Sequence, residues 1–313
     1  MSWRHIRLAG LALALVPVAG SGSAQSLSDQ PSAGPAPGAE LSFSTDSDHA
    51  DVVKLLSRGL WSFSDRDHYQ GVAIERAWFS PSGDKTRKET RAYVDLADNL
   101  GSDWRWRARV GTNGDTILGA ASLRSKDWSK EFFLEREIVE TKLGLDRGIY
   151  YTFGGVSFDI PAGPRDTFNV MGGLQAFTGK NVRYHLRGNY VHVLAPKLGL
   201  SAQLRGRYFH STRPGEFDYY SPRNFLSVLP VLQMRRFDDR GWMYLVALGY
   251  GAQKATGSHW QSARLADLRI ESPVRSNRLQ AFAQLQYSNN SLNQGGGDYH
   301  YVSGRLGVTI RLK

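Results

Sequence analysis

Two stretches near the C-terminus decide the fold: RLQAFAQLQYS, residues 278–288, and YVSGRLGVTIRL, residues 301–312. Apolar side chains occupy nearly every second position of both stretches, and arginine, glutamine, serine or threonine stand between them. Because successive side chains of a β-strand point to opposite faces, each stretch predicts a strand with one apolar and one polar face. Strands of a membrane barrel, with lipid outside and a wet lumen inside, have this composition.

The same kind of strand recurs along the chain. Sixteen runs separated by turn residues are predicted near 40–46, 52–63, 69–79, 86–97, 103–112, 116–126, 130–139, 148–160, 166–177, 182–194, 198–211, 224–236, 241–253, 260–271, 276–288 and 299–312. An even number of strands is typical of a bacterial barrel whose two chain ends both face the periplasm. The predicted fold is therefore all-β, a transmembrane antiparallel β-barrel of about 16 strands in the bacterial outer membrane, formed by residues 39–313.

Connection lengths agree with this orientation. Bacterial barrels keep their periplasmic turns short and let the extracellular loops grow. The short connections 99–102, 161–165, 195–197 and 237–240 all fall on one side when the count starts in the periplasm, and the long polar connections 211–223 and 289–298 fall on the other. A soluble sandwich would share the alternation, but sixteen strands around one soluble core would be exceptional.

The N-terminus predicts export. Arg4, His5 and Arg7 precede an apolar stretch over residues 8–19, and small residues follow at 22–24, which is the plan of a signal peptide ending near residue 24. Residues 25–38, rich in serine, proline and glycine, are predicted as a flexible linker. Neither segment is long and apolar enough to span a membrane as a helix.

Composition limits the functions further. The chain has no cysteine, which excludes disulfides and thiolate metal sites, and it carries a formal net charge of +10. Such an excess attracts nucleic acid, anionic lipid or anionic sugar, and the envelope destination argues against nucleic acid as a partner. Outer-membrane lipid and lipopolysaccharide are expected partners of the barrel wall.

The polar faces of the predicted strands carry many arginines. The candidate lumen-lining residues, expected to form a low-affinity substrate track, are Arg105, Arg107, Arg109, Arg183, Arg187, Arg205, Arg207, Arg235, Arg269, Arg278, Arg305 and Arg311. Fewer acids, Glu89, Asp95, Glu135, Glu137, Asp159, Asp267 and Glu271, share that face. Guanidinium groups could bind a hydroxyl-rich or anionic solute, or they could pair with acids on neighbouring strands and only stiffen the wall. The arginine surplus is the part that the second interpretation leaves unexplained.

No pattern predicts an enzyme. None of the histidines within the predicted barrel is followed two residues later by serine, the spacing that would bring both side chains to one face of a strand. The acids Asp46, Asp48 and Asp51 beside His49 could form a loop site, but solvated acids are far commoner. The sequence predicts no catalytic residue, no metal site and no cofactor.

One region resembles a known family. The loop and strand YYSPRNFLS, residues 219–227, follow a strand that ends in GRYF, residues 206–209, and are similar to part of the C-terminal barrels of bacterial exopolysaccharide exporters, those for cellulose and poly-N-acetylglucosamine. REIVET, residues 136–141, leading into GIYYT, residues 148–152, supports the resemblance, as does the closing pattern of residues 276–289. The resemblance spans roughly residues 130–312.

This resemblance implies a sixteen-stranded pore through which a growing polysaccharide leaves the cell, in a biofilm or cellulose-type system. Tyr219, Tyr220, Ser221 and Pro222 would belong to an extracellular loop that closes or guides the exit. The family's long periplasmic repeat region is missing here, so we expect a separate periplasmic repeat protein and an inner-membrane glycan synthase as partners. Positive lumen charge favours a neutral or anionic glycan over a cationic one. A general or anion-preferring porin, and a non-transporting envelope barrel holding lipopolysaccharide through Lys85, Arg87 and Lys88, remain alternatives.

Overall fold

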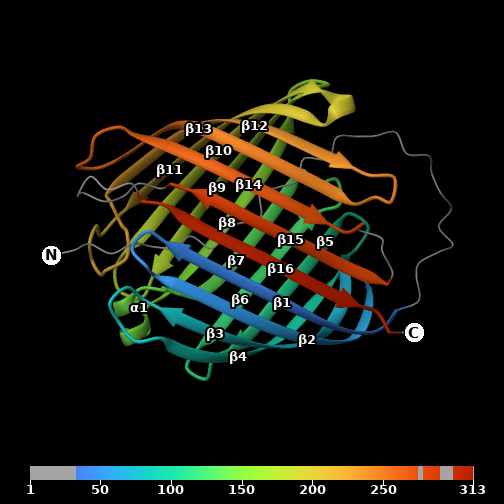
Figure 1. Ribbon diagram of the computed structural model, residues 1–313, viewed down its shortest axis with the longest axis horizontal. Coiled ribbons are helices and arrows are strands. Elements are labelled where there is room, and N and C mark those ends of the chain that lie inside the picture. Colours follow the sequence, from blue (N-terminus) through green and yellow to red (C-terminus); the bar gives the residue numbers. More distant parts are fainter. Residues whose placement is uncertain (1–32, 274–277, 290–298, 313) are drawn as a thin grey trace.

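The chain forms one closed antiparallel β-barrel of sixteen strands, in which each strand pairs with its neighbours in sequence and β1 pairs with β16 (Figure 1). The computed structural model describes residues 33–273, 278–289 and 299–312. The predicted signal peptide, residues 1–24, lies outside them and stays a prediction. Among the described residues, no helix is long and apolar enough to cross a membrane.

All sixteen predicted strands are found close to their expected positions. They are β1 (Gly34–Asp46), β2 (Asp51–Asp65), β3 (His68–Ser80), β4 (Arg87–Leu100), β5 (Trp104–Thr112), β6 (Ile117–Ser125), β7 (Lys130–Ile138), β8 (Tyr150–Pro161), β9 (Asp166–Phe177), β10 (Val182–Ala195), β11 (Leu200–Ser211), β12 (Asn224–Phe237), β13 (Met243–Ala255), β14 (Gln261–Glu271), β15 (Leu279–Ser288) and β16 (Tyr301–Ile310). Two short helices interrupt the described connections, α1 (Lys142–Arg147) and η1 (Pro196–Leu198).

The start of β1 corrects the predicted linker. The strand begins at Gly34, so residues 34–38 of the segment expected to be flexible are part of the barrel. The prolines there suggested a linker because proline cannot donate to a β-ladder. Pro35 is accommodated at a register shift, where its carbonyl accepts a hydrogen bond from the backbone N–H of Leu312 (2.8 Å).

The two faces of the wall differ as the alternation predicts. On β10, Tyr184 and Leu186 are half exposed and point outward, whereas Arg183 and His185 are almost fully buried inside the barrel. Outward-facing leucine, isoleucine, valine and aromatic side chains of this kind occur on every strand, which gives the barrel an apolar outer surface suited to lipid.

The two ends of the barrel also differ. Leu312, the last described residue, lies near the start of β1, at the end of the barrel opposite α1 (Figure 1). Short turns such as those at 66–67 and 101–103 lie at the end that holds the C-terminus, which identifies it as periplasmic. The longer connections 139–149 and 212–223 lie at the extracellular end.

Candidate functional site: the lumen and its extracellular cap

A network of ion pairs stiffens one side of the inner wall. Arg91 on β4 has a fully buried side chain that binds Glu75 (3.1 Å), Glu89 (3.2 Å) and Glu137 (2.9 Å). Lys54 continues the network to Glu137 and, at 2.8 Å, to Glu140. Because three carboxylates surround one guanidinium, this network offers no free positive charge to a solute.

A second group of ion pairs lies nearer the periplasmic end of the same wall. Asp95 is 1% exposed and accepts from Arg109 at 2.8 Å, with Arg58 3.8 Å away. Arg58 also reaches Glu40 on β1 (3.4 Å), and Glu40 pairs with Arg305 on β16 (2.5 Å), which continues the ion pairs across the closure of the barrel. Lys54, Arg58 and Arg91 were not predicted from the sequence, because only strand register shows which acids they face.

The structure places all twelve candidate arginines on the inner face or at its periplasmic edge, but their surroundings divide them. Four pair with acids: Arg105 with Asp67, Arg109 with Asp95, Arg269 with Asp267 and Glu271, and Arg305 with Glu40. Arg183 and Arg205 bind amide or hydroxyl groups. Arg235 lies beside Phe237, and Arg278 and Arg311 meet at the periplasmic rim through a backbone hydrogen bond. Arg107, Arg187 and Arg207 face no carboxylate in the described chain. Their role as a substrate track remains a prediction.

The opposite wall, formed by β9–β13, carries no acid on its described inner face. Its inward positions follow from register with Arg183, Arg187 and Arg207, and they hold arginine, histidine, amides, hydroxyls and apolar residues only. Five of them are arginines, namely Arg183, Arg187, Arg205, Arg207 and Arg235. We call β9–β13 the acid-free sector. It makes the lumen electrically one-sided, because the acids that neutralise arginine lie on the other strands.

Aromatic rings form a row on the inner wall toward the extracellular end. Successive ring centroids lie 5.1 Å apart from Phe133 to Phe153, 4.9 Å to His185, 5.7 Å to Phe209 and 5.0 Å to Phe225. The rings lie against the wall where the neighbouring strand has glycine: a Cβ on Gly155 would approach Phe133 to 2.6 Å, and one on Gly173 would approach Phe153 to 2.8 Å. This inner aromatic row gives the lumen apolar surface beside its guanidinium groups.

The inner face is not uniformly polar. Buried apolar side chains on β12, β13 and β14 pack together inside the barrel: Leu229, Val231, Met243, Leu245, Ala247 and Ala263. Alternation did not predict this cluster, because β13 is apolar on both faces and its inward positions cannot be told from its outward ones by composition.

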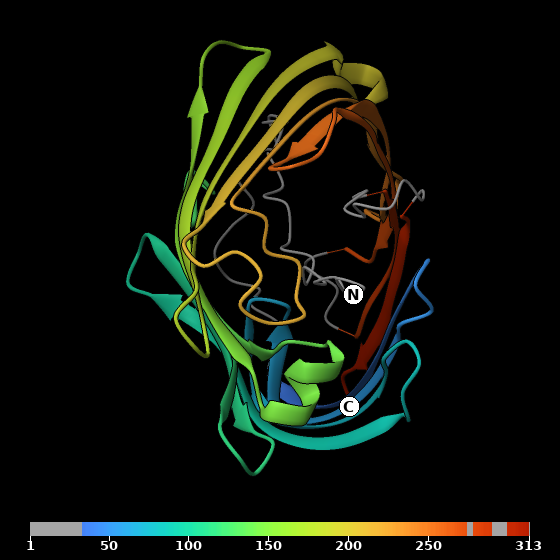
Figure 2. The same ribbon diagram turned by 90° about the vertical axis from the view of Figure 1, so that its left-hand side faces the viewer.

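Three connections form a cap at the extracellular end. We define the extracellular cap as α1, the connection 178–181 and the β11–β12 loop, residues 212–223. Figure 2 shows α1 and the β11–β12 loop within the outline of the barrel, seen from this end. Asp218 of the loop accepts from the Thr141 hydroxyl (2.6 Å) and from the backbone N–H of Leu143 (2.8 Å), which fixes the loop to the start of α1.

The predicted loop residues lie inside this cap. Tyr219 is buried, stacks on Phe177 at 4.3 Å and accepts a hydrogen bond from Asn181 (2.8 Å), while burial raises the pKa of Tyr219 to about 12. The Tyr220 carbonyl accepts from Arg183 at 2.6 Å, and Ser221 accepts from the backbone N–H of Gly215 at 2.9 Å. Pro222 is half-buried beside them. Glu216 of the same loop also accepts hydrogen bonds from the backbone N–H groups of Lys180 (2.7 Å) and Asn181 (2.8 Å). The β11–β12 loop and the connection 178–181 therefore hold each other in place.

Helix α1 itself was not predicted from the sequence. Thr141 caps its N-terminus by accepting from the backbone N–H of Gly144, and Gly148 ends it with a left-handed φ of 61°. Ion pairs join it to the β3–β4 loop: Lys142 binds Asp84, and Arg87 binds Asp146. The hydrogen bond from Lys142 lowers the pKa of Asp84 below its usual range, and the same bond raises the pKa of Lys142.

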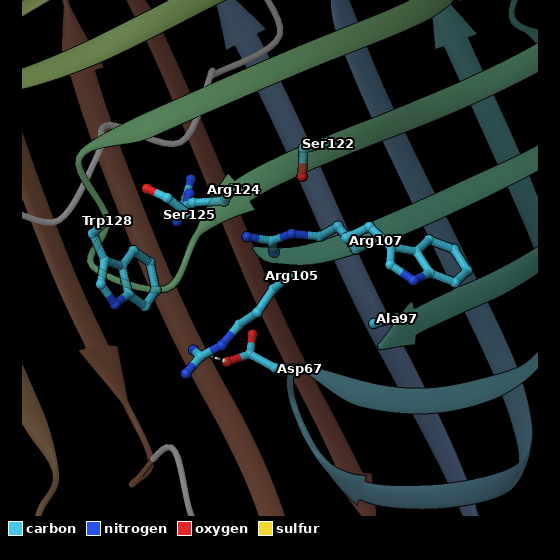
Figure 3. Close-up of a pocket in the computed structure, with 9 residues that line it drawn as sticks. Asp67, Ala97, Arg105, Arg107, Ser122, Arg124, Ser125 and Trp128 are labelled. Atoms are coloured by element: carbon cyan, nitrogen blue, oxygen red, sulfur yellow. Dashed lines mark hydrogen bonds and ion pairs between the residues drawn. The ribbon is translucent and has the colours of Figure 1, made fainter. Parts of the chain in front are cut away.

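A pocket near the periplasmic mouth gathers basic and aromatic side chains. Figure 3 shows Arg105, Arg107 and Arg124 projecting from neighbouring strands, with Trp128 of the β6–β7 turn at the edge. Arg124 lies 4.7 Å from the Trp128 ring and Arg105 lies 6.0 Å from it. Trp128 has φ of 66°, a conformation that costs energy for any residue with a Cβ.

The described residues contain no group of three or more histidine, aspartate or glutamate side chains that could hold a metal ion. The acids beside His49 serve the β1–β2 turn instead. Asp46 accepts from the backbone N–H groups of Asp48 (3.0 Å) and Ala50 (3.0 Å), and from the Tyr299 hydroxyl (3.3 Å).

Comparison with known proteins supports the fold. No family model matches the chain, and no curated protein matches it. Among solved structures, a bacterial polysaccharide outer membrane secretin is similar over 88% of this chain and 98% of its own, with 13% identity and a TM-score of 0.61. The outer-membrane proteins OccK5 (OpdH) and OprD of Pseudomonas aeruginosa each match 90% of this chain, and 99% and 96% of their own, at 10% identity and TM-scores of 0.43 and 0.45. The similarity to the secretin supports the fold of an outer-membrane β-barrel.

Proposed function

We propose that this protein is an outer-membrane pore that exports an exopolysaccharide, a neutral or anionic glycan. The observation that carries the proposal is the acid-free sector, in which arginines and amides line the lumen beside the inner aromatic row. Guanidinium and amide donors suit hydroxyl and carboxylate oxygens, and ring faces suit the apolar faces of sugars. The similarity to a polysaccharide secretin supports the same cargo class.

Passive export requires binding that is weak and distributed along the path. Several separate donors along one wall meet this condition better than one deep site does, because a polymer must be released from each contact to advance. The cargo would come from an inner-membrane glycan synthase and reach the barrel through a separate periplasmic repeat protein. A biofilm or cellulose-type secretion system has this organisation.

The extracellular cap supports the proposal of export over general diffusion. A general or anion-preferring porin would use the same positive wall but needs a constantly open path, whereas here the β11–β12 loop is held across the opening by Asp218 and Glu216. The anchoring alternative has less support, since Arg87 is occupied by Asp146 and Asp84.

Two measurements test the proposal. In planar bilayers, the wild-type barrel should pass little current, and deletion of residues 213–222 should open it. In the native host, deletion of the gene should abolish extracellular polymer while the envelope stays intact. Large, constantly open, anion-selective currents from the wild type would instead identify a porin, and unchanged polymer secretion in the deletion strain would refute export.

A further inference from the structure

Two arginines of the acid-free sector face each other without a counter-ion. Arg187 on β10 and Arg207 on β11 are direct cross-strand partners, and both point into the lumen from the central part of their strands. Residues in this relation have Cβ atoms about 5 Å apart, and like charges placed there repel each other. No carboxylate of the described chain lies beside either guanidinium.

Several donors around this pair are buried and unused. Nε and Nη2 of Arg207, Nε of Arg187 and the Tyr220 hydroxyl have no hydrogen-bond partner among the described residues. Buried polar groups are nearly always paired, so a cluster of unpaired donors in one place calls for a ligand. The charged members of the cluster, Arg187 and Arg207, are both cations, and the Tyr220 hydroxyl is a neutral donor. A ligand that pairs with all of them is therefore an anion.

The aromatic row fixes where these groups lie. The Arg207 guanidinium is 5.5 Å from the Phe209 ring and 5.6 Å from the Phe225 ring. The Tyr220 ring is 6.3 Å and 6.4 Å from the same two rings, edge-on to both. Arg207 and Tyr220 therefore share one supporting surface, with Tyr220 approaching from the extracellular cap.

Neighbouring side chains hold this arrangement without occupying it. Arg183 donates to the Tyr220 carbonyl (2.6 Å), to Ser211 (3.3 Å) and to Gln175 (3.4 Å), and so positions the loop rather than a solute. His185 Nε2 lies 3.1 Å from the same Gln175 oxygen. The ring and the loop are thus fixed, and the two central guanidinium groups remain available.

We propose that Arg187 and Arg207 form an oxyanion-binding site on the lumen wall, with the Tyr220 hydroxyl completing it from above, and that it takes a carboxylate of an acidic glycan. Two planar guanidinium groups present paired donors that match the two oxygens of a carboxylate. The bound anion would also remove the repulsion between the two arginines. The cargo assignment rests on the proposed function, because it narrows that glycan to an acidic one; the oxyanion site itself does not depend on export.

Binding to the purified full-length barrel in detergent tests the site. Oligogalacturonate is the carboxylate probe, a maltooligosaccharide of equal length is the uncharged one, and inorganic phosphate is a small oxyanion. We expect oligogalacturonate to bind, and its affinity to fall roughly tenfold or more in Arg187→Gln and in Arg207→Gln, since hydrogen bonds to a charged group are lost. The control is Arg240→Gln, which removes an arginine from an exposed periplasmic turn outside the lumen track, and it should change the affinity by less than about twofold.

The unfolding temperature provides a second measurement, which separates the loss of the binding site from a failure of the variant to fold. Because Arg207 is repelled by its neighbour, Arg207→Met should unfold at a temperature equal to or above that of the wild type while losing oligogalacturonate binding. Oligogalacturonate should raise the melting temperature of the wild type and not that of Arg207→Met.

The outcomes separate this site from the export proposal. Equal losses in the Arg240→Gln control, equal binding of the maltooligosaccharide, or a strongly destabilised Arg207→Met would overturn the site. Binding of phosphate without binding of oligogalacturonate would overturn the glycan assignment. If the arginine variants lose binding as expected but the gene deletion leaves polymer secretion unchanged, the oxyanion site stands and the export function fails.

Discussion

At the scale of single residues, Arg91 is the centre of the ion-pair network. Replacing it with methionine leaves Glu75, Glu89 and Glu137 close together without their shared cation. We expect Arg91→Met to lower the free energy of unfolding by about 3–5 kcal/mol, the usual result of breaking a buried ion pair on one side. A urea titration in which unfolding is monitored by the gel mobility of the barrel measures this change in the free energy of unfolding.

Arg305→Met is the control for that experiment. Arg305 pairs with Glu40, but its side chain is 49% exposed, so its loss should cost less than about 1 kcal/mol. Equal losses for the two variants would show that burial of the Arg91 network adds nothing to stability.

Trp128 tests backbone strain near the periplasmic mouth. Its left-handed φ is strained for any L residue with a Cβ, whereas glycine adopts it freely. Alanine and glycine both remove the contact with Arg124, so Trp128→Gly should be more stable than Trp128→Ala by about 1 kcal/mol. The same pair of substitutions at Ser102, an exposed turn position without a positive φ, should show no advantage for glycine. Thermal unfolding of the four variants decides the point.

The sequence predicts which face of a strand each arginine occupies, but not which side chains it contacts on the neighbouring strands. Alternation correctly indicated that Arg109 and Arg207 point the same way, since a face follows from counting residues. It could not show that Arg109 meets Asp95 while Arg207 meets another arginine, because those neighbours depend on the register between strands.

At the scale of elements, Asp218 joins the β11–β12 loop to α1. Asp218→Ala removes both of its hydrogen bonds, to Thr141 and to the backbone of Leu143. The loss of two bonds to a carboxylate should raise the open population of the cap roughly tenfold or more. Single-channel recording should therefore show more frequent openings.

Asp239→Ala is a control for the cap, because Asp239 is an exposed residue of a periplasmic turn. It removes the same charge far from the cap and should leave the opening frequency unchanged. Similar behaviour of the two variants would mean that net charge, rather than the tie to α1, controls opening.

The pH dependence of the cap follows from the Lys142–Asp84 pair. The folded pKa of Asp84 lies below its ordinary value of 3.8, so its contribution to stability is present above pH 3.8 and is lost as the pH falls through the lower folded pKa. The folded pKa of Lys142 is raised, so its contribution is present below 10.5 and is lost as the pH rises through the higher folded pKa. The protection of α1 amides against hydrogen exchange, measured relative to the intrinsic rate at each pH, should thus stay constant between these limits and fall in acid. In Asp84→Asn the loss of protection in acid should be smaller; an unchanged acid response would exclude this pair as its cause.

The strands could be predicted from the sequence, whereas helix α1 and its tie to the β11–β12 loop could not. Each strand carries its own alternation, which turn residues interrupt, so its position is a local property. Helix α1 has only six residues, too few to show a helical period, although Thr141 and Gly148 are its cap residues. Its tie to Asp218, 77 positions away from Thr141 in the sequence, is a tertiary contact that no local pattern encodes.

At the scale of the whole molecule, the lumen has one neutralised wall and one positive wall. A pore opened by deleting residues 213–222 should therefore select anions, and the selectivity should weaken as salt screens the fixed charge, with a Debye length of about 10 Å at 0.1 M and about 3 Å at 1 M. Reversal potentials across a potassium chloride gradient measure this. Arg187→Gln combined with Arg207→Gln should reduce the selectivity, and a cation-selective pore would contradict the charge distribution described here.

The barrel is closed by pairing β1 with β16, from Gly38 opposite Thr309 to Asp46 opposite Tyr301. Until that last pairing forms, both terminal strands present unpaired N–H and C=O groups, which are templates for aggregation. Closure joins residues at nearly opposite ends of the chain, and contacts of such long sequence separation form slowly. Before closure, the barrel is thus an open sheet with two unpaired edges that can bind other chains. The fraction of the protein that reaches the membrane without aggregating depends on how long other proteins shield those edges.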